Sequence, residues 1–277
     1  MTNKRMFNFL HTYNPESILI NIGPIKIYWY GFFIVSGILL GMIVIFKLAD
    51  KYKVSKETII DSVFYLIIAG IIGARAYHVL LEPSYYFANP LSVFKVWEGG
   101  LAIHGAIIAG LITTWFFAKK YCLDLWQLFA IYVPGLALGQ AIGRWGNYFN
   151  QELYGTPTSL PWGIPIEPIN RVNNYFDMYF FHPTFLYESI GSLLIFAILI
   201  YLHSWILKKE KPNYKIIVYS YLFLYSILRF SLEFIRIDPT PEFIGLRWPQ
   251  IISLIIIAII STLFLKNYKT KNPLKNI

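Results

Sequence analysis

The sequence predicts an all-α, polytopic integral membrane protein with seven transmembrane helices, the N-terminus outside and the C-terminus in the cytoplasm. Hydrophobic residues make up 56% of the 277 residues, and charged residues only 14%. Apolar runs of about 20 residues recur along the chain, which is the length needed to cross a hydrocarbon core of roughly 30 Å. The connections between these runs alternate between lysine-rich and lysine-poor. Together these observations predict both the class and the orientation.

Seven apolar runs are long enough to form the predicted spans. The first begins near Ile27 and is long enough to cross a bilayer, whereas a cleavable signal peptide has a shorter apolar region near its start. Residues 1–26 are therefore expected to remain as an exported or interfacial segment, and residues 1–277 to form a single transmembrane domain. The expected spans are about 28–49, 58–81, 100–118, 125–145, 184–206, 214–235 and 247–265.

Lysine placement predicts the orientation. Lysines cluster in alternate connections and in the tail, and the positive-inside rule puts these segments in the cytoplasm. The connections at about 82–99, 146–183 and 236–246 are acidic with few lysines, so they are expected outside. The net charge of +9 then reflects orientation and contact with anionic membrane lipid, and no nucleic-acid partner is expected. The clustered lysines are Lys47, Lys51, Lys53, Lys56, Lys119, Lys120, Lys208, Lys209, Lys211, Lys215, Lys266, Lys269, Lys271 and Lys275.

The seven arginines are placed differently, because none falls in a connection predicted to be cytoplasmic. Arg75, Arg144, Arg229 and Arg236 lie in or at the ends of spans, and the predicted topology puts each nearer the outer leaflet. A planar guanidinium binds phosphate or carboxylate through two hydrogen bonds, so this placement indicates an anionic substrate. For any single arginine, the alternative is snorkelling to the outer headgroups or a structural ion pair.

Residues 143–155, which read GRWGNYFNQELYG, concentrate polar side chains where an apolar span ends. Charge at the edge of the hydrocarbon layer is costly, so an arginine with amide and carboxylate neighbours predicts a functional site. The outer connection at about 146–183 is too short for a second globular domain, but long enough for a lid or a substrate-guiding structure. The polar side chains are Arg144, Asn147, Asn150 and Glu152.

Glycines recur at every fourth position before this segment. Gly135, Gly139 and Gly143 form a stripe that lets another helix approach closely. The helix that leads to Arg144 is therefore expected to be tightly packed and to hold that side chain firmly.

Further polar residues are predicted at the same depth in other spans. The third span opens with WEGGLAIHG, which places His104 about one turn inside the outer boundary, and the first opens with YWYG, which includes Tyr30. Taken alone, a histidine near a helix end is more often structural, and a Tyr/Trp pair is usually an interfacial belt.

The sixth span ends with LRFSLEFIR, in which Arg229, Glu233 and Arg236 share one helical face. The presence of Glu233 has two equally good explanations. It could take part directly in catalysis, or it could form an ion pair that lowers the free-energy cost of burying the arginine. The fifth span is preceded by FHPTFLYES, where His182 and Pro183 fit a helix start. Negative charge at Glu188 is favourable there on helix-dipole grounds alone.

The sequence has no Cys/His metal spacing, no phosphate loop and no nucleophile elbow, so neither a metal nor a cofactor is expected. Its single cysteine, Cys122, falls on the predicted cytoplasmic side. It cannot form an intrachain disulfide, and it is badly placed to act as a nucleophile for an outer site.

Several of these motifs together resemble the bacterial prolipoprotein diacylglyceryl transferase family. The matching segments are GRWGNYFNQELYG, EGGLAIHG, FHPTFLYE, the RFxxExxR pattern at 229–236, Trp29-Tyr30-Gly31 and Gly73-Ala74-Arg75. The resemblance implies a seven-span enzyme of the bacterial cytoplasmic (inner) membrane with its active site toward the outer leaflet. It implies transfer of the diacylglyceryl group of phosphatidylglycerol to the lipobox cysteine thiol in the signal peptide of an exported prolipoprotein. This first step of lipoprotein maturation forms a thioether and releases glycerol phosphate.

The resemblance also assigns candidate site residues. Tyr30, His104, Arg144 and Arg229 are the expected catalytic residues, and the expected substrate-binding residues are Arg75, Arg144, Asn147, Glu152, Gly155, Arg229 and Glu233. The chain departs from the family's motifs at Gln151, where glycine is common, and at Thr184-Phe185, where serine and glutamine are usual.

The proposed chemistry fits these residue types. Displacement at a glycerol carbon needs neutralisation of the phosphate leaving group, for which Arg144 and Arg229 are suited. A thiol with a pKa near 8.5 is mostly protonated at neutral pH, so a base or a positive field must favour the thiolate. His104 is the expected base or proton relay, although Arg144 could supply the field instead. Glu233 is expected to orient Arg229, with Asn147 and Glu152 holding the lipid headgroup or lipobox backbone and Tyr30 bordering the site.

Two other functions fit intramembrane arginines. A transporter or channel for an anionic solute would show repeat symmetry and polar residues through the full membrane depth, whereas the polar residues here crowd toward one leaflet. A non-catalytic lipid-binding membrane protein would bind phosphatidylglycerol without releasing glycerol phosphate. An assay of that release with a lipobox peptide separates all three functions.

Overall fold

The computed structural model describes the backbone of residues 9–271 and the side chains of residues 9–266. The described chain is mostly helical, with short two-stranded sheets in its connections. It divides into two compact units, one holding residues 44–132 and the other holding the residues before and after them. Helices α2 (Trp29–Lys51) and α6 (Leu125–Phe149) each contribute residues to both units.

Six helices in the described part are long and apolar enough to span a membrane. They are α2 and α6 together with α3 (Lys56–Leu81), α7 (Thr184–Ile206), α8 (Lys215–Leu232) and α9 (Trp248–Lys271). The expected span at 100–118 corresponds to α5 (Ile103–Lys120), whose 18 residues include His104, Lys119 and Lys120. These polar residues at its two ends lower its mean hydropathy, so α5 is not among the six.

In the unit of residues 44–132, α3 packs closely against α5. A Cβ added at Gly73 would lie 2.6 Å from the carbonyl oxygen of Gly105, so the two backbones meet where neither residue carries a side chain. Ser55 caps α3 by accepting a hydrogen bond from the Thr58 amide at 3.1 Å. Three short helices connect the pair: α4 (Pro83–Ala88), η1 (Pro90–Phe94) and η2 (Val96–Glu98).

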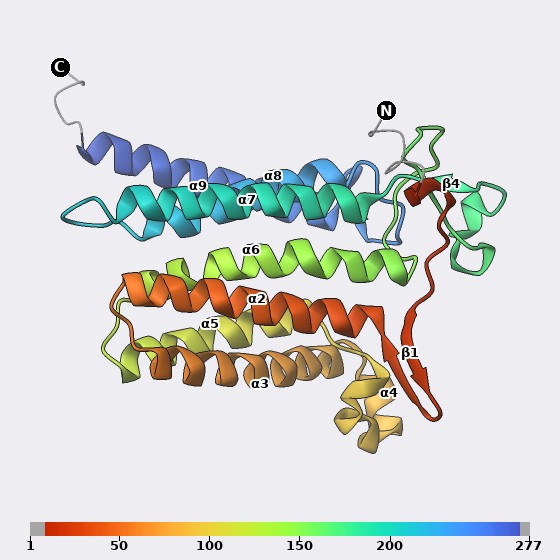
Figure 1. The fold of residues 1–277 in the computed structure, drawn as a ribbon, viewed down its shortest axis with the longest axis horizontal. Helices are drawn as coiled ribbons and strands as arrows, with labels where there is room; N and C mark the ends of the chain where they lie inside the picture. The colour runs from red at the N-terminus through yellow and green to blue at the C-terminus, as the bar shows by residue number, and fades with distance from the viewer. Residues whose placement is uncertain (1–8, 272–277) are drawn as a thin grey trace. The chain divides into compact units, whose positions relative to one another are not determined.

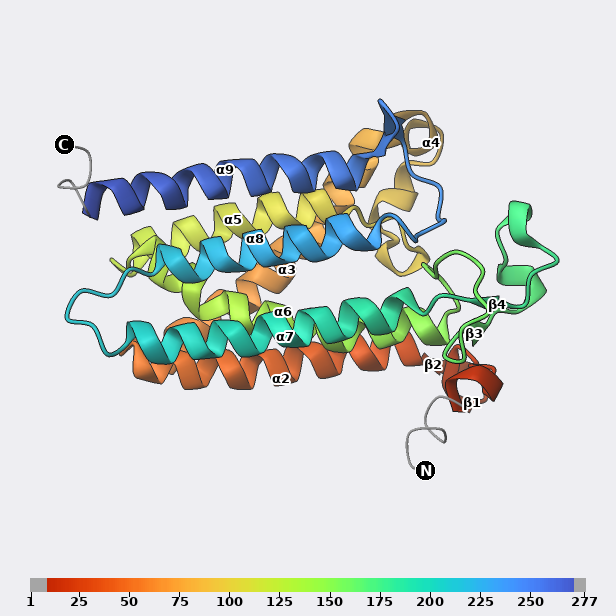
Figure 2. The same ribbon diagram turned by 90° about the horizontal axis from the view of Figure 1, so that it is seen from above.

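In the other unit, α7, α8 and α9 run side by side, as Figures 1 and 2 show. The glycine stripe predicted on the fourth span is confirmed as a packing surface at Gly135 and Gly139. A Cβ added at Gly41 of α2 would lie 2.9 Å from the Gly135 carbonyl oxygen, and one at Gly37 would lie 3.2 Å from that of Gly139. The part of α6 that leads to Arg144 is therefore held directly against α2.

Apart from the turn between α7 and α8, the connections of this unit gather at one end of its helices (Figures 1 and 2). They contain the antiparallel pairs β1 (Ile18–Ile22) with β2 (Ile25–Tyr28), β3 (Ile164–Pro165) with β4 (Phe180–Phe181), and β5 (Glu242–Phe243) with β6 (Leu246–Arg247), and the short helices η3 (Pro168–Asn170) and η4 (Asn173–Tyr175). The connection at 150–183 has its own apolar core, in which Tyr154, Ile164 and Phe181 pack against Tyr148 and Phe185. This core attaches the connection to the ends of α6 and α7.

The contact between α2 and α6 predicts a position-specific sensitivity to added volume. Gly41→Val is expected to lower the free energy of unfolding by about 1–3 kcal/mol, because the new side chain meets the Gly135 carbonyl. Thermal unfolding in detergent micelles measures the change. Gly70→Val is the matched control, since a Cβ added at Gly70 of α3 has nothing within 4 Å. Equal losses in the two variants would show that the contact does not matter.

Candidate active site

The end of α6 presents a chain of three polar side chains. Arg144 Nη1 donates a hydrogen bond to Asn147 Oδ1 at 3.2 Å, and Asn147 Nδ2 donates to Glu152 Oε1 at 2.7 Å. The two partners together fix the orientation of the Asn147 amide, because its oxygen must face the cation and its nitrogen the carboxylate. The structure thus joins three of the four polar residues predicted in this segment, and Asn150 is not part of this chain.

Glu188 of α7 is the main partner of Arg144. Its Oε1 lies 2.6 Å from Arg144 Nη2, and only 2% of its side chain is exposed. The Tyr225 hydroxyl of α8 donates to the same oxygen at 3.3 Å, and Arg236 Nη1 lies 4.0 Å from Oε2. Glu188 lies beyond the first turn of α7, so its position reflects these contacts rather than the helix dipole alone.

The predicted pair of Arg229 and Glu233 forms at the end of α8, with Arg229 Nη2 3.0 Å from Glu233 Oε2. Arg236 lies one turn further on, with its Nε 4.0 Å from the same oxygen. The helix ends at Leu232, three residues before the expected boundary. It ends there because the chain turns so that Arg236 forms a backbone bridge with Gly155.

Arg247 and Asp238 complete the network from the connection between α8 and α9. Arg247 Nη1 lies 3.1 Å from Glu233 Oε1, and Arg236 Nε lies 2.8 Å from Asp238 Oδ1. Arg247 also donates to the carbonyl oxygens of Arg236, at 2.9 Å, and of Asp238. Four arginines are therefore paired directly with three carboxylates, Glu188, Glu233 and Asp238. A fourth carboxylate, Glu152, is joined to Arg144 through Asn147.

Two features of this network leave binding capacity for a ligand. Within the described residues, Arg229 Nη1 is buried without a hydrogen-bond partner. The Glu233 oxygens lie at ion-pair distance from Arg229 and Arg247, but no aligned hydrogen bond reaches them. Because a buried donor without a partner is costly, the Arg229 guanidinium is suited to an additional anionic acceptor.

Asp238 shows the electrostatic effect of the arginines outside the spans. Burial alone would raise the pKa of this carboxyl. The hydrogen bond from Arg236 and the charges of Arg236 and Arg247 outweigh burial, so the pKa of Asp238 lies below its ordinary value. The ionised form of Asp238 is therefore the form that this fold stabilises.

Tyr30 borders the site from the first turn of α2. A Cβ added at Gly146 would lie 2.7 Å from Tyr30 Cδ2, so the tyrosine ring lies directly on the backbone between Arg144 and Asn147. The neighbouring Trp29 stacks on Phe149 at the end of α6, with ring centroids 4.4 Å apart. These aromatic contacts join the start of α2 to the end of α6.

Gly155 allows the outer connection to pack closely. Its amide donates to the His182 carbonyl oxygen at 3.0 Å, and a Cβ there would lie 2.9 Å from both His182 Cβ and the Ile235 carbonyl oxygen. The Thr156 amide donates to the same Ile235 carbonyl at 2.7 Å. The structure therefore shows a packing reason for glycine at position 155.

Gln151 and Phe185, which depart from the family's motifs, both have structural roles here. Gln151 has a positive φ of 51°, a backbone conformation that glycine adopts most readily. Its side chain donates to the Pro15 carbonyl oxygen at 3.0 Å and accepts from the Glu167 amide at 2.7 Å, which ties two segments together. Phe185 is 3% exposed and stacks on Tyr148, with ring centroids 4.6 Å apart.

An apolar groove of about 290 Å³ runs along α6 beside this site. Trp145, Ala141 and Leu138 follow one side of the helix inward from Arg144, and Ser189 follows Glu188 on α7. The Ser189 hydroxyl donates to the Ala141 carbonyl oxygen at 2.7 Å, so the groove presents mainly apolar surface. The groove is lined by Trp145 and Ser189, which follow Arg144 and Glu188 in the chain.

Two predicted residues, Arg75 and His104, belong to the unit of residues 44–132. Arg75 is 7% exposed, and its five N–H donors are all directed at backbone carbonyls, those of Ser92, Val93, Lys95, Gly99 and Gly100. His104 is exposed in the first turn of α5, with its ring 5.8 Å from that of Tyr77. Arg75 therefore holds the glycine segment that leads to His104.

The sequence alone did not identify Glu188, Asp238 or Arg247 as site residues. The available signal was a buried acidic residue in the apolar fifth span, since an unpaired carboxylate at that depth is costly. The pairings connect residues far apart in the chain, so their spacing gave no further indication. Among the residues that the structure describes, no cluster of three or more His, Cys, Asp or Glu side chains could hold a metal ion.

Comparison with known proteins identifies the family. The profile of the prolipoprotein diacylglyceryl transferase family matches residues 17–266. The chain belongs to this family. Proteins named phosphatidylglycerol–prolipoprotein diacylglyceryl transferase are similar to it over most of its length. The one from Synechococcus elongatus is 41% identical over 247 residues, which cover 88% of this chain and 85% of that protein.

Two further members of the prolipoprotein diacylglyceryl transferase family give the same result. The relative from a Nostoc species is 41% identical over 272 residues, covering 97% of this chain and 95% of that protein. The relative from Finegoldia magna is 42% identical over 243 residues, covering 87% and 92%. The predicted family and the predicted enzyme class, a transferase, are both confirmed.

The buried charge of Glu233 predicts a large stability effect. Glu233→Gln is expected to lower the free energy of unfolding by about 3–5 kcal/mol, because it leaves Arg229 and Arg247 without their shared carboxylate. Thermal unfolding in detergent micelles measures the loss. Glu242→Gln removes the same charge at an exposed position of β5 and is expected to have little effect. A Glu233→Gln protein as stable as this control would contradict the network.

The lowered pKa of Asp238 predicts a pH-dependent contribution to stability. Its ionised form is stabilised on folding, so the contribution is full above about pH 5 and is lost as the pH falls through the folded-state pKa, below the ordinary 3.8. Asp238→Asn is therefore expected to lower the melting temperature at neutral pH and to approach the wild-type value in acid. Melting temperatures of both proteins across pH 3–8 provide the test, and a constant difference would contradict it.

Proposed function

We propose that this chain transfers the diacylglyceryl group of phosphatidylglycerol to the thiol of the lipobox cysteine of exported prolipoproteins. The observation that carries the proposal is the arginine network, in which four guanidiniums face three carboxylates and the buried Arg229 Nη1 has no described hydrogen-bond partner. A buried guanidinium N–H without an acceptor suits a phosphodiester oxygen. The names of the relatives, phosphatidylglycerol–prolipoprotein diacylglyceryl transferase, support the same substrates.

The reaction is a displacement at carbon. The cysteine sulfur attacks the carbon of the diacylglyceryl group that is bonded to the phosphate oxygen. An S–C bond forms, and the bond between that carbon and the phosphate oxygen breaks. The phosphate oxygen leaves with the electron pair, so glycerol phosphate is released and a thioether remains. Arg144 and Arg229 neutralise the charge that develops on the leaving phosphate, because guanidinium remains protonated and hydrogen-bonds phosphate oxygens well. Glu233 holds Arg229 in place.

The remaining candidates have supporting roles in this proposal. Asn147 and Glu152 bind the lipid headgroup or the lipobox backbone, and Tyr30 borders the bound substrate. Gly155 and Arg75 act through the backbone segments that they hold rather than through direct contact. The apolar groove lined by Trp145 and Ser189 receives an acyl chain, because its walls are apolar and these two residues follow Arg144 and Glu188 in the chain.

His104 is the proposed base or proton relay for the thiol. Its imidazole is exposed and makes no hydrogen bond within the described part of the chain. Neutral imidazole is the side chain most often used to accept a proton near neutral pH. The alternative is that the positive field of Arg144 favours the thiolate without a dedicated base.

The membrane arrangement is part of the proposal. Six helices qualify as spans by length and hydropathy, and α5 is the proposed seventh, which gives an N-terminus outside and a C-terminus in the cytoplasm. The lysine distribution supports this orientation. In the unit that contains Arg144, the lysine-rich turn between α7 and α8 is at the opposite end of the helices from the site (Figure 1). The proposed location is the bacterial cytoplasmic (inner) membrane, with the active site toward the outer leaflet.

The proposed roles of His104 and Arg144 predict that an alanine substitution at either residue lowers transferase activity, and that added imidazole restores activity only to the His104 variant. Purified protein is assayed for lipidation of a lipobox peptide and for release of glycerol phosphate from phosphatidylglycerol. Arg144→Ala is expected to lose at least about a hundredfold in kcat, and His104→Ala about a hundredfold to ten-thousandfold, with partial rescue by added imidazole. If His104→Ala keeps near-normal turnover while Arg144→Ala is inactive, the base assignment is wrong and the field explanation holds.

The same assay separates the other function classes. A lipid-binding protein without catalytic activity would retain phosphatidylglycerol and release no glycerol phosphate. A transporter would move an anionic solute across a sealed vesicle in the absence of any peptide. A folded wild-type protein that gives either result, with no lipidation of the peptide, would overturn the proposed transfer.

A further inference from the structure

A second groove lies at the start of α2, and its polar groups take no part in the arginine network. Its volume is about 610 Å³. Ser17, Lys26 and Asn150 provide its polar lining from the segment before β1, from β2 and from the end of α6. Ile27, Tyr28 and Tyr30 provide apolar and aromatic surface. The groove therefore combines a cationic polar end with apolar walls.

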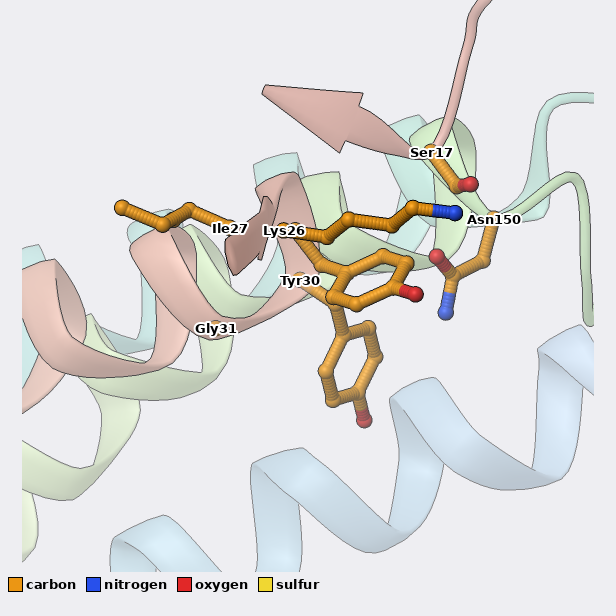
Figure 3. A pocket seen from close by; sticks show the side chains of 7 residues that line it. Ser17, Lys26, Ile27, Tyr30, Gly31 and Asn150 are labelled. Atoms are coloured by element: carbon orange, nitrogen blue, oxygen red, sulfur yellow. The ribbon is translucent and has the colours of Figure 1, made fainter. Parts of the chain in front are cut away.

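The polar end is formed by three unengaged groups. Figure 3 shows the Lys26 ammonium extending toward the Ser17 hydroxyl and the Asn150 carboxamide, which come from two other segments. Within the described residues, none of these three end groups makes a hydrogen bond or ion pair with the protein, and no carboxylate lines the groove. A cation with a hydroxyl and an amide beside it is a donor set suited to phosphate oxygens.

The groove lies at the predicted depth of lipid headgroups. Lys26 precedes the first residue of the α2 span, Trp29, by three residues, which is at most about 10 Å of extended chain. The hairpin around it exposes Ile22 at 67% and Ile25 at 63%, an apolar surface suited to the bilayer boundary. Lysine at this depth is placed to contact a lipid phosphate.

The groove also adjoins the candidate active site. Tyr30 lines the groove, and its ring lies on Gly146, which directly precedes Asn147 in α6. Asn150 follows at the end of the same helix. The Tyr30 ring therefore contacts both the groove and the part of α6 that carries Arg144 and Asn147.

The geometry points to a holding site for the phosphodiester headgroup of an anionic outer-leaflet lipid, phosphatidylglycerol in the proposed reaction. This inference rests on the proposed function, because it gives the lipid donor a second position before transfer. Lys26 neutralises the phosphate, Ser17 and Asn150 donate hydrogen bonds to its oxygens, and the aromatic wall contacts the glycerol and the first methylenes. General attraction of any cationic surface for anionic lipid is the competing explanation.

The test measures the dependence of transfer on phosphatidylglycerol in neutral phosphatidylcholine vesicles, with a lipobox peptide as acceptor. Lys26→Gln is expected to raise KM for phosphatidylglycerol about threefold to tenfold while kcat stays within about twofold. Ser17→Ala and Asn150→Ala are each expected to raise KM about twofold or more without any change in charge. Lys26→Arg keeps the charge and is expected to retain most of the wild-type affinity.

The control is Lys95→Gln, which removes the same charge from another predicted outer connection, where Lys95 pairs with Glu98 at 3.1 Å. A KM for Lys26→Gln equal to that of this control, or normal KM values for Ser17→Ala and Asn150→Ala, would reduce the effect to general attraction and overturn the proposal. Weaker inhibition of Lys26→Gln by added glycerol phosphate, with lipid KM unchanged, would assign the groove to the free product and also overturn it.

A binding measurement keeps this test separate from the proposed function. Without acceptor peptide, wild-type protein, Lys26→Gln and Lys95→Gln are compared for retention of phosphatidylglycerol at equilibrium. Reduced retention by Lys26→Gln alone supports the groove even if no transfer is detected. Equal retention by all three overturns it, whatever the outcome for transfer.

Discussion

The buried pair between Arg144 and Glu188 is the interaction on which the site depends. Each partner is costly to bury alone at the edge of a bilayer, and their separation of 2.6 Å removes much of that cost for both. Because Arg144 belongs to α6 and Glu188 to α7, the pair fixes two helices at one depth. Tyr225 and Arg236 then join the same carboxylate, which brings α8 and the chain beyond it into register.

The surrounding backbone has its own supports. Glycines bring α2 against α6, aromatic stacking of Trp29 on Phe149 fixes the start of α2, and Gly155 lets the outer connection lie against the end of α8. Functional side chains placed on packed helices and anchored connections have little freedom to move, which is what preorganised charge stabilisation requires. The arginine network is thus held both by its own ion pairs and by contacts that carry no charge.

The positions of the apolar helices and the pairing of Arg229 with Glu233 were predictable from the sequence. Hydropathy located the spans to within a few residues, and the spacing of Arg229 from Glu233 predicted their pair, because both depend on residues close in the chain. The third apolar run, expected at 100–118, corresponds to α5, whose His104 and two terminal lysines keep its mean hydropathy below that of the six candidate spans. The end of α8 was placed three residues too late, because the bridge between Arg236 and Gly155 is a tertiary contact. The roles of Glu188 and Arg247 depend on segments far apart, and spacing contains no information about such pairs.

The carboxylates of the arginine network have a consequence for turnover. A phosphodiester carries a single negative charge near neutral pH. A phosphate monoester carries between one and a half and two negative charges near neutral pH, as for phosphorylated side chains. Cleavage of the donor in the proposed site therefore raises the negative charge of the bound headgroup. Repulsion from Glu188, Glu233 and Asp238 would then favour departure of the cleaved headgroup. The carboxylates that hold the arginines in place would therefore also promote product release.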